Sequence, residues 1–353
     1  MVFASGYFKT SYLSDLSLVE TRTHWIFLSV LIIGLVIFPF ISSVFLLDLA
    51  NQVFLALIGA MALMLLTGYA GQISLGHAGF IAAGAFTTAI LFKEMKAPIW
   101  ITFPASGIVG AILGIIFGLP SLRLRGLYLA LSTLAMHFLV TYFGSEYETK
   151  RGFSTGVVIS PPSLGPFKIE DPRVWYFLLL FIDILVLLFS INLARSRTGR
   201  AWSAVRNREV VAEALGIKVS FYKLSAFITS SVMTSIAGCL FAYYRGFVSV
   251  EAFSLFMTIQ YIAMIIIGGL GTILGTIFGT IFVVLLPYVI DMIGKMLHVP
   301  ARLTTYMFAI QYASFGLIMI IFLVLEPGGL VSVWNRIKNY FIFWPYRYKP
   351  LGS

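Results

Sequence analysis

Charged side chains are scarce in this sequence, and this scarcity excludes most soluble proteins. Asp, Glu, Lys and Arg make up 11% of the 353 residues, whereas ordinary soluble domains contain about 25%. Apolar residues make up 59%, which is enough for about ten membrane-spanning helices of about 20 residues each. The composition therefore excludes a soluble enzyme and a disordered chain. It predicts an all-α, polytopic membrane protein with about ten transmembrane helices.

Cysteine and acidic residues are rare as well. The one cysteine, Cys239, cannot form an internal disulfide, which excludes a disulfide-stapled secreted domain. Lys and Arg outnumber Asp and Glu by 24 to 14. We interpret this excess as the basic residues that collect in the cytoplasmic loops of membrane proteins, so we expect membrane lipid and no nucleic acid as a partner.

Continuous apolar runs mark the expected spans and divide the chain. Most Lys and Arg residues fall in 1–24, 121–125, 195–223 and 326–353, which places both termini inside the cell. We expect a cytoplasmic N-terminal segment (1–24) without a cleaved signal peptide, a transmembrane domain (25–325) and a cytoplasmic basic and aromatic tail (326–353). Runs 76–92 and 259–270 are short or rich in small residues and are candidates for broken helices. The ten runs cover 25–47, 50–68, 76–92, 99–120, 126–144, 174–194, 224–244, 259–270, 275–290 and 303–325.

Two expected turns, 67–72 and 268–272, are rich in glycine and contain no charge. An uncharged, glycine-broken backbone is unusual for a surface loop. It is better explained as irregular backbone that is buried in protein or lines a water-filled cavity. Because both halves of the chain carry this feature, we expect an internal repeat whose broken helices meet near a substrate path. Tight helical hairpins without substrate contact are the alternative.

Polar side chains beside these turns are candidates for the substrate path, because polar groups at membrane depth are costly unless paired or hydrated. Hydrogen bonding to neighbouring backbone is the alternative role, and we favour it for His77. Asp183, in the middle of an apolar run, is expected to make a structural hydrogen bond rather than to relay protons. The path candidates are Gln72, Ser74, His77, Gly268, Gly269 and Gly271.

The stretch 195–223 is strongly basic. From 198 to 215 it is expected to form one amphipathic helix in which Trp202, Val205, Ala212 and Leu215 share a face, and Gly216 is placed to end it. Such a helix either anchors at the lipid interface or docks a soluble partner. We favour docking. The expected docking residues are Arg200, Arg206, Arg208, Glu209, Glu213 and Gly216.

Motifs of catalysis are missing. Gly294-Lys295 is followed by Met296 and lacks the upstream glycine of a P-loop. The four histidines show no metal-ligand spacing, and no Gly-x-Ser-x-Gly elbow occurs. We therefore expect a chain that is not an enzyme and holds no cofactor, so that any ATP would be hydrolysed on another subunit.

Three stretches resemble the LivM-type permease subunits of branched-chain amino acid ABC importers, and the likeness runs from about residue 50 to about 330. The first is 66–80 (LTGYAGQISLGHAGF). The second combines 198–201 (TGRA) with 213–217 (EALGI), and the third is 267–275 (IGGLGTILG). Shorter support comes from 122–130 (LRLRGLYLA).

This resemblance implies the type II permease fold of vitamin B12 importers, in a bacterial inner membrane. It implies a homologous second permease (LivH-like), two ATPases (LivG- and LivF-like) and a periplasmic or lipid-anchored substrate-binding protein. Residues 198–217 would then be the coupling helix, and alternating access would be driven by ATP on the partners. Urea, short amides or another small acid are alternative substrates. Two rivals remain: a secondary transporter or channel that needs no ATPase, and an intramembrane enzyme with His77 or His137 as its base.

Overall fold

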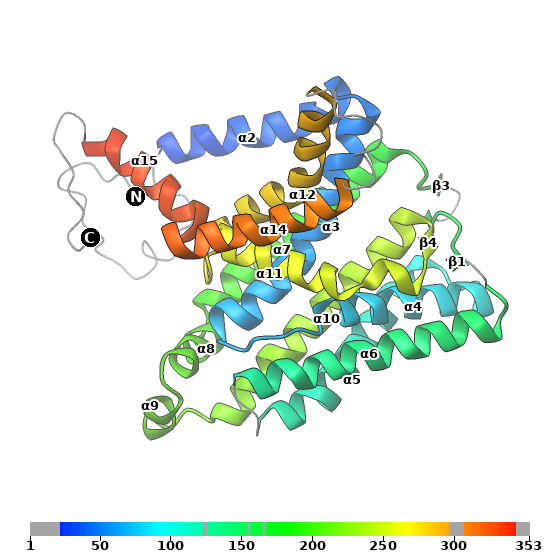
Figure 1. Cartoon of the computed structure of the whole chain (residues 1–353), viewed down its shortest axis with the longest axis horizontal. Coiled ribbons are helices and arrows are strands. Elements are labelled where there is room, and N and C mark those ends of the chain that lie inside the picture. The colour runs from blue at the N-terminus through cyan, green and yellow to red at the C-terminus, as the bar shows by residue number, and fades with distance from the viewer. Residues whose placement is uncertain (1–21, 123–125, 154–155, 165–166, 297–306, 344–353) are drawn as a thin grey trace.

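The computed structural model describes residues 22–122, 126–153, 156–164, 167–296 and 307–343, so the predicted segment 1–24 lies almost wholly outside it. Each of the ten predicted apolar runs contains a helix (Figure 1). These helices are α2 (Arg22–Ile41), α3 (Val44–Leu63), α4 (His77–Met95), α5 (Ile99–Ser121), α6 (Leu127–Lys150), α7 (Pro172–Arg195), α10 (Val219–Arg245), α11 (Leu255–Gly268), α12 (Ile273–Met296) and α14 (Met307–Leu325).

Fewer of these helices are long and apolar enough to cross a membrane by themselves. Among the described residues six segments qualify, and α14 with α15 (Gly329–Phe343), bent by 51°, makes a seventh. Helix α11 has only 14 residues. The architecture is that of a polytopic membrane protein, while ten complete spans and the type II fold stay predictions. The six segments are Val44–Tyr69, His77–Met95, Ile99–Pro120, Pro172–Arg195, Val219–Arg245 and Ile273–Ile293.

Helices α3, α4 and α10 form the centre of the bundle. Helix α10 packs against α5 and α4, α3 packs against α7 and α10, and α11 packs against α12. In the segment made by α3 and the π-helix η1 (Met64–Tyr69), 72% of the residues in its most apolar stretch are buried. In α7 the corresponding share is 17%. Helix α7 therefore turns most of its apolar side chains outward, where lipid or another chain can cover them.

Glycines allow the central helices to touch backbone to backbone. A Cβ on Gly84 of α4 would lie 1.8 Å from the Ser235 carbonyl oxygen of α10, and one on Gly238 would lie 2.0 Å from the Ile81 carbonyl oxygen. Because neither position has room for a methyl group, the α4–α10 crossing depends on glycine on both helices. Gly110 and Gly114 of α5, four residues apart, pack closely on the side chains of Ser235 and Ser231 of α10.

Two small antiparallel ladders depart from the predicted all-α class. Strand β1 (Val157–Val158) pairs with β4 (Phe247–Val248), and β2 (Ser163–Leu164) pairs with β3 (Phe167–Lys168). Each strand has two residues; the β1–β4 ladder joins the connections that follow α6 and α10, and the β2–β3 ladder lies within the connection between α6 and α7. In Figure 1 these strands lie at the right, whereas α8 (Arg197–Asn207) and α9 (Glu209–Ala214) lie at the left, so the molecule has a strand end and an α8–α9 end.

Candidate functional site

A non-helical segment, residues 70–76, connects η1 to α4 inside the bundle. Gln72 and Ser74 are 3% and 2% exposed. The Gln72 amide donates to the Lys223 carbonyl oxygen at 2.9 Å, and the Ser74 hydroxyl accepts from the Gly76 N–H at 3.3 Å. Gly71 and Ile73 between them are exposed, so the segment is irregular backbone that is buried in part, as the uncharged turn predicted. Both side chains bond to backbone, which is the structural role named as the alternative to a substrate path.

The two glycine-rich turns meet, as predicted. A Cβ on Gly68 would lie 2.8 Å from the Gly271 backbone nitrogen. Gly269 and Gly271 have φ of 123° and 79°, a backbone conformation that favours glycine. A Cβ on Gly329, at the start of α15, would lie 2.5 Å from the Gly269 nitrogen. The turn at 268–271 is thus held between η1 and the part of the predicted tail that the structure describes.

The predicted coupling helix is two helices rather than one. Helix α8 ends at Asn207 and α9 starts at Glu209, because Arg208 between them has extended backbone angles (φ −156°, ψ 106°). Gly216 ends α9 as predicted: its φ is 82°, and its N–H donates to the Glu213 carbonyl oxygen at 2.9 Å. Because the direction of the chain changes at Arg208, the two helices do not present one continuous face.

This break separates the residues that were expected to share a buried face. Trp202, Val205 and Ala212 are buried, but Leu215 is 75% exposed. Val210 of α9 is also exposed, at 73%. The exposure of these apolar side chains differs from the prediction because the helical periodicity of α8 does not continue through Arg208.

Two of the predicted docking residues make contacts with the transmembrane part, although Arg206 is also exposed. The Arg206 guanidinium donates to the Gly68 carbonyl oxygen, and its side chain packs on Gly71 and Gly271. Glu209 forms an ion pair with Lys223 of α10. Among the other expected docking residues, Arg200, Arg208, Glu213 and Gly216 are exposed. Arg206 therefore links α8 to both glycine turns, and Glu209 links α9 to α10.

A polar cavity of about 580 Å³ lies at this end of the molecule. Its walls come from the 70–72 segment, from Gly126 and Leu129, and from the junction of α8 and α9. Charged groups on the wall are Arg206, Arg208, Glu209 and Lys223. Gln72 lines this cavity too, so the segment is both buried in protein and adjacent to a hollow space.

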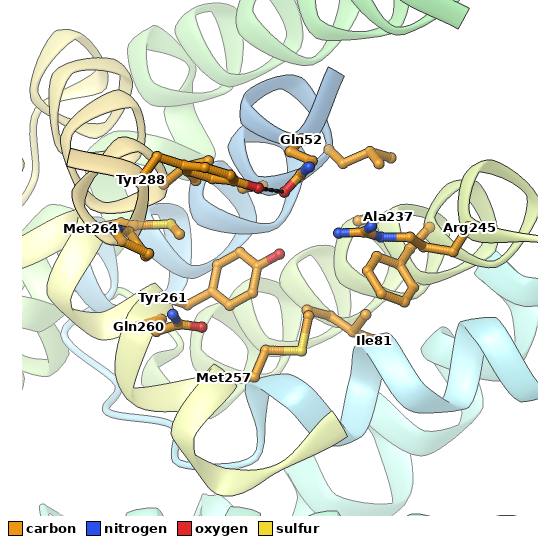
Figure 2. A pocket seen from close by; sticks show the side chains of 14 residues that line it. Gln52, Ile81, Ala237, Arg245, Met257, Gln260, Tyr261, Met264 and Tyr288 are labelled. Carbon is orange, nitrogen blue, oxygen red and sulfur yellow. Dashed lines mark hydrogen bonds between the residues drawn. The ribbon is translucent and has the colours of Figure 1, made fainter. Parts of the chain in front are cut away.

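A second cavity, of about 260 Å³, lies between α3, α10, α11 and α12 (Figure 2). Arg245, its charged residue, is at the end of α10 near the strands, whereas Lys223 of the first cavity is near the start of that helix. The 22 residues between them correspond to about 33 Å of helix. The two cavities therefore lie toward opposite ends of the molecule.

His77 does not line this second cavity but lies behind one of its walls. Its side chain is 1% exposed, and its ring centroid is 4.8 Å from that of Tyr261, which does line the cavity. This cavity was not predicted from the sequence. Gln52 and Gln260 are amides within apolar runs, the same pattern that made Gln72 a candidate. Its other polar members, Arg245, Tyr261 and Tyr288, come from three different helices.

Asp183 does not make the structural hydrogen bond that was expected. Its carboxyl group is 2% exposed, and both of its oxygens lack a hydrogen-bond partner among the described residues. It lies on the face of α7 that carries Trp175, Tyr176 and Leu179, all buried. The expectation failed because an acid inside an apolar run indicates a need for a partner without indicating whether a neighbouring helix supplies one.

Comparison with known proteins gives one consistent result. Residues 45–325 match the family described as branched-chain amino acid transport system / permease component. The chain is 32% identical over 285 residues to the high-affinity branched-chain amino acid transport system permease protein LivM of Salmonella typhimurium, and 31% identical over 280 residues to LivM of Escherichia coli. Each match covers 72% of this chain and 65% of the relative, just under two thirds.

An archaeal relative matches more weakly. The probable branched-chain amino acid transport permease protein LivM of Methanocaldococcus jannaschii is 28% identical over 229 residues, which are 64% of this chain. No solved structure matches. The family match spans the glycine turns, both cavities and the α8–α9 pair. The chain therefore belongs to the permease component family of branched-chain amino acid transport systems.

Proposed function

We propose that this chain is a membrane-spanning subunit of an ATP-driven importer of branched-chain amino acids in a bacterial inner membrane. It would pair with a homologous second permease, two ATPases and a substrate-binding protein. The observation that carries the proposal is the Arg206 contact. A peripheral element, α8–α9, is bonded to the place where two broken helices meet. Force applied to α8 would therefore be delivered to those turns.

The exposed surface of α9 supports docking of a soluble ATPase. Val210 and Leu215 are exposed beside Arg208 and Glu213. Exposed apolar residues rimmed by charge are typical of protein–protein interfaces. In Figure 1 the start of α2 and α15 lie toward the same side as α8 and α9, which supports the orientation with both termini inside the cell.

Alternating access would then follow from motion of α8. ATP binding between the partner ATPases would displace α9, and Arg206 would carry that displacement to Gly68 and to the 268–271 turn. Moving these turns would open the polar cavity at the α8–α9 end while the cavity near Arg245 closes. The two cavities at opposite ends of the bundle would then be exposed in turn, as alternating access proposes.

The test is to purify the tagged chain from its own cells. We expect two ATPases and a second permease to accompany it. In proteoliposomes that contain the binding protein, leucine uptake should require ATP and should be inhibited by isoleucine and valine but not by urea. Uptake by the chain alone under an ion gradient would contradict the proposal and favour a secondary transporter. Inhibition by urea would be consistent with the ATP-driven mechanism but would contradict the proposed substrate.

The docking surface makes a separate prediction. Replacing Val210 and Leu215 with aspartate should reduce ATPase binding at least tenfold, because charge would replace apolar contact area at the interface. The fold should survive, since both side chains are more than 70% exposed. Pull-down of the ATPases measures the effect. Val158→Asp is the control, an exposed apolar residue at the strand end. Equal binding by all three proteins would rule out α9 as the docking element.

A further inference from the structure

The cavity between α3, α10, α11 and α12 contains one unpaired cation. Arg245 is an exposed residue at the end of α10, lies 5.9 Å from the centroid of the Phe241 ring, and makes no ion pair or hydrogen bond with another described residue. In Figure 2 its guanidinium group points into the cavity, toward the hydroxyl of Tyr261. A guanidinium group presents several N–H donors whose geometry matches a carboxylate. The cavity therefore offers an anion a charged partner that the protein itself leaves unused.

Tyr261 adds a neutral donor beside this cation. The residue is 6% exposed, and its hydroxyl has no hydrogen-bond partner among the described residues. Gly59 and His77 fix the ring from behind: a Cβ on Gly59 would lie 2.8 Å from the ring, and the His77 ring packs at 4.8 Å. A buried hydroxyl usually has a partner. This hydroxyl is held in place and aimed at the cavity, where a ligand can supply that partner.

The opposite wall carries acceptors backed by a carboxylate. The Gln52 amide donates to Asp48 at 2.7 Å, and the Gln52 carbonyl oxygen accepts from the Tyr288 hydroxyl at 3.0 Å. The carbonyl oxygen of Gln52 has a second lone pair for another donor. Because the Asp48 charge lies directly behind Gln52, this wall favours a cation. Arg245 thus lines the cavity on one side, and the opposite charge of Asp48 lies behind Gln52 on another.

The rest of the lining is apolar and the space is small. Leu55, Ile81, Met257, Met264 and Val284 form the remaining walls. Pockets for drug-sized ligands measure about 300–1,000 Å³, so 260 Å³ is suited to a smaller molecule. Methionine side chains adapt to branched and linear aliphatic groups alike. An apolar side chain of a few carbons fits these walls.

We propose that this cavity is a binding site for a zwitterionic amino acid with an aliphatic side chain. Its carboxylate would bind Arg245 and the Tyr261 hydroxyl, its ammonium group would bind the Gln52 carbonyl oxygen, and its side chain would contact Met257 and Met264. The proposal deepens the function proposed above and rests on it, because it places the substrate within this one subunit. A neutral amide such as urea would leave Arg245 without an anionic partner.

Cysteine protection in the assembled transporter tests this site. Cys239 is buried, so a cysteine introduced in place of Gln260, which lines the cavity without a role in the proposed contacts, can be labelled selectively with a small thiol reagent. Leucine at ten times its dissociation constant should slow labelling about tenfold. Leucinamide, which lacks the carboxylate, should protect far less. If Gln260→Cys does not assemble, Val284→Cys, at another lining residue without a role in the proposed contacts, serves as the second labelling position.

Substitution of the cation completes the test. Arg245→Gln should raise the leucine concentration needed for protection by about 10- to 100-fold, because it removes one charge-assisted hydrogen bond to the carboxylate. Arg245→Lys should recover part of it. Arg173→Gln removes an exposed arginine elsewhere and should change nothing. Equal protection by leucine and leucinamide, or no effect of Arg245→Gln, would overturn the site. A complex that imports leucine with ATP but shows no protection would overturn this proposal alone.

Discussion

Replacing Gly84 with alanine is expected to leave almost no folded protein in the membrane. A methyl group at this position would lie 1.8 Å from the Ser235 carbonyl oxygen. No side-chain rotation can relieve a clash between a Cβ and a backbone atom, so α4 and α10 would have to separate. Overpacking a core usually costs about 1–3 kcal/mol, and a clash of backbone at the central crossing should cost at least the upper value. The yield of monodisperse protein in detergent measures the effect.

Gly107→Ala is the matched control for this prediction. Gly107 of α5 also faces α10, but a Cβ there would meet only Ile236 and Val232 side-chain atoms at 3.6 Å, an ordinary contact distance. This variant should fold with wild-type yield and a similar thermal midpoint. If Gly84→Ala folds as well as Gly107→Ala, the α4–α10 crossing described above is incorrect.

Replacing Arg206 with alanine is expected to abolish most transport while the transporter still assembles. The substitution removes the charged donor to the Gly68 carbonyl oxygen, together with packing against Gly71 and Gly271. Hydrogen bonds to charged groups contribute about 1.5–3 kcal/mol, which corresponds to a change of about 10- to 100-fold in a conformational equilibrium. ATP-dependent leucine uptake should fall by that factor. ATPase pull-down should remain, because the exposed residues of α9 are unchanged.

A second variant on the same helix separates this linkage from a general loss of charge. Arg197 is an exposed residue of α8, and Arg197→Ala should transport normally. Arg206→Lys keeps the charge but not the planar guanidinium group, so an intermediate rate is expected. Loss of ATPase binding in Arg206→Ala would instead place Arg206 in the docking surface, as the sequence alone had suggested. Normal transport by this variant would remove the linkage from the mechanism.

The sequence predicts the helices of this protein well because long apolar runs have few alternatives in lipid. Every one of the ten runs contains a helix, and Gly216 ends α9 where a helix-terminating glycine was expected. The meeting of the turns at Gly68 and Gly271 was also predictable. Uncharged irregular backbone at membrane depth must be enclosed by protein.

The features that were missed depend on tertiary contacts that no local pattern encodes. Arg208 interrupts an otherwise helical stretch without proline or glycine, so periodicity alone continued the helix and placed Leu215 on the wrong face. Arg206 was assigned to the surface because arginines in a basic stretch usually face water. Arg206 is exposed, but its long side chain also reaches a carbonyl group 138 positions earlier in the chain.

The contacts that three segments make with the 268–271 turn also limit where residues can be inserted into this chain. Parts of η1, α8 and the start of α15 all touch this turn, and glycines provide the clearance. An insertion in any of these segments would push the other two out of register. The strands in the connection between α6 and α7 lie at the other end of the molecule from α8 and α15 (Figure 1), so this connection is not subject to the same constraint. Extra residues in longer relatives are therefore expected to accumulate there or at the chain ends.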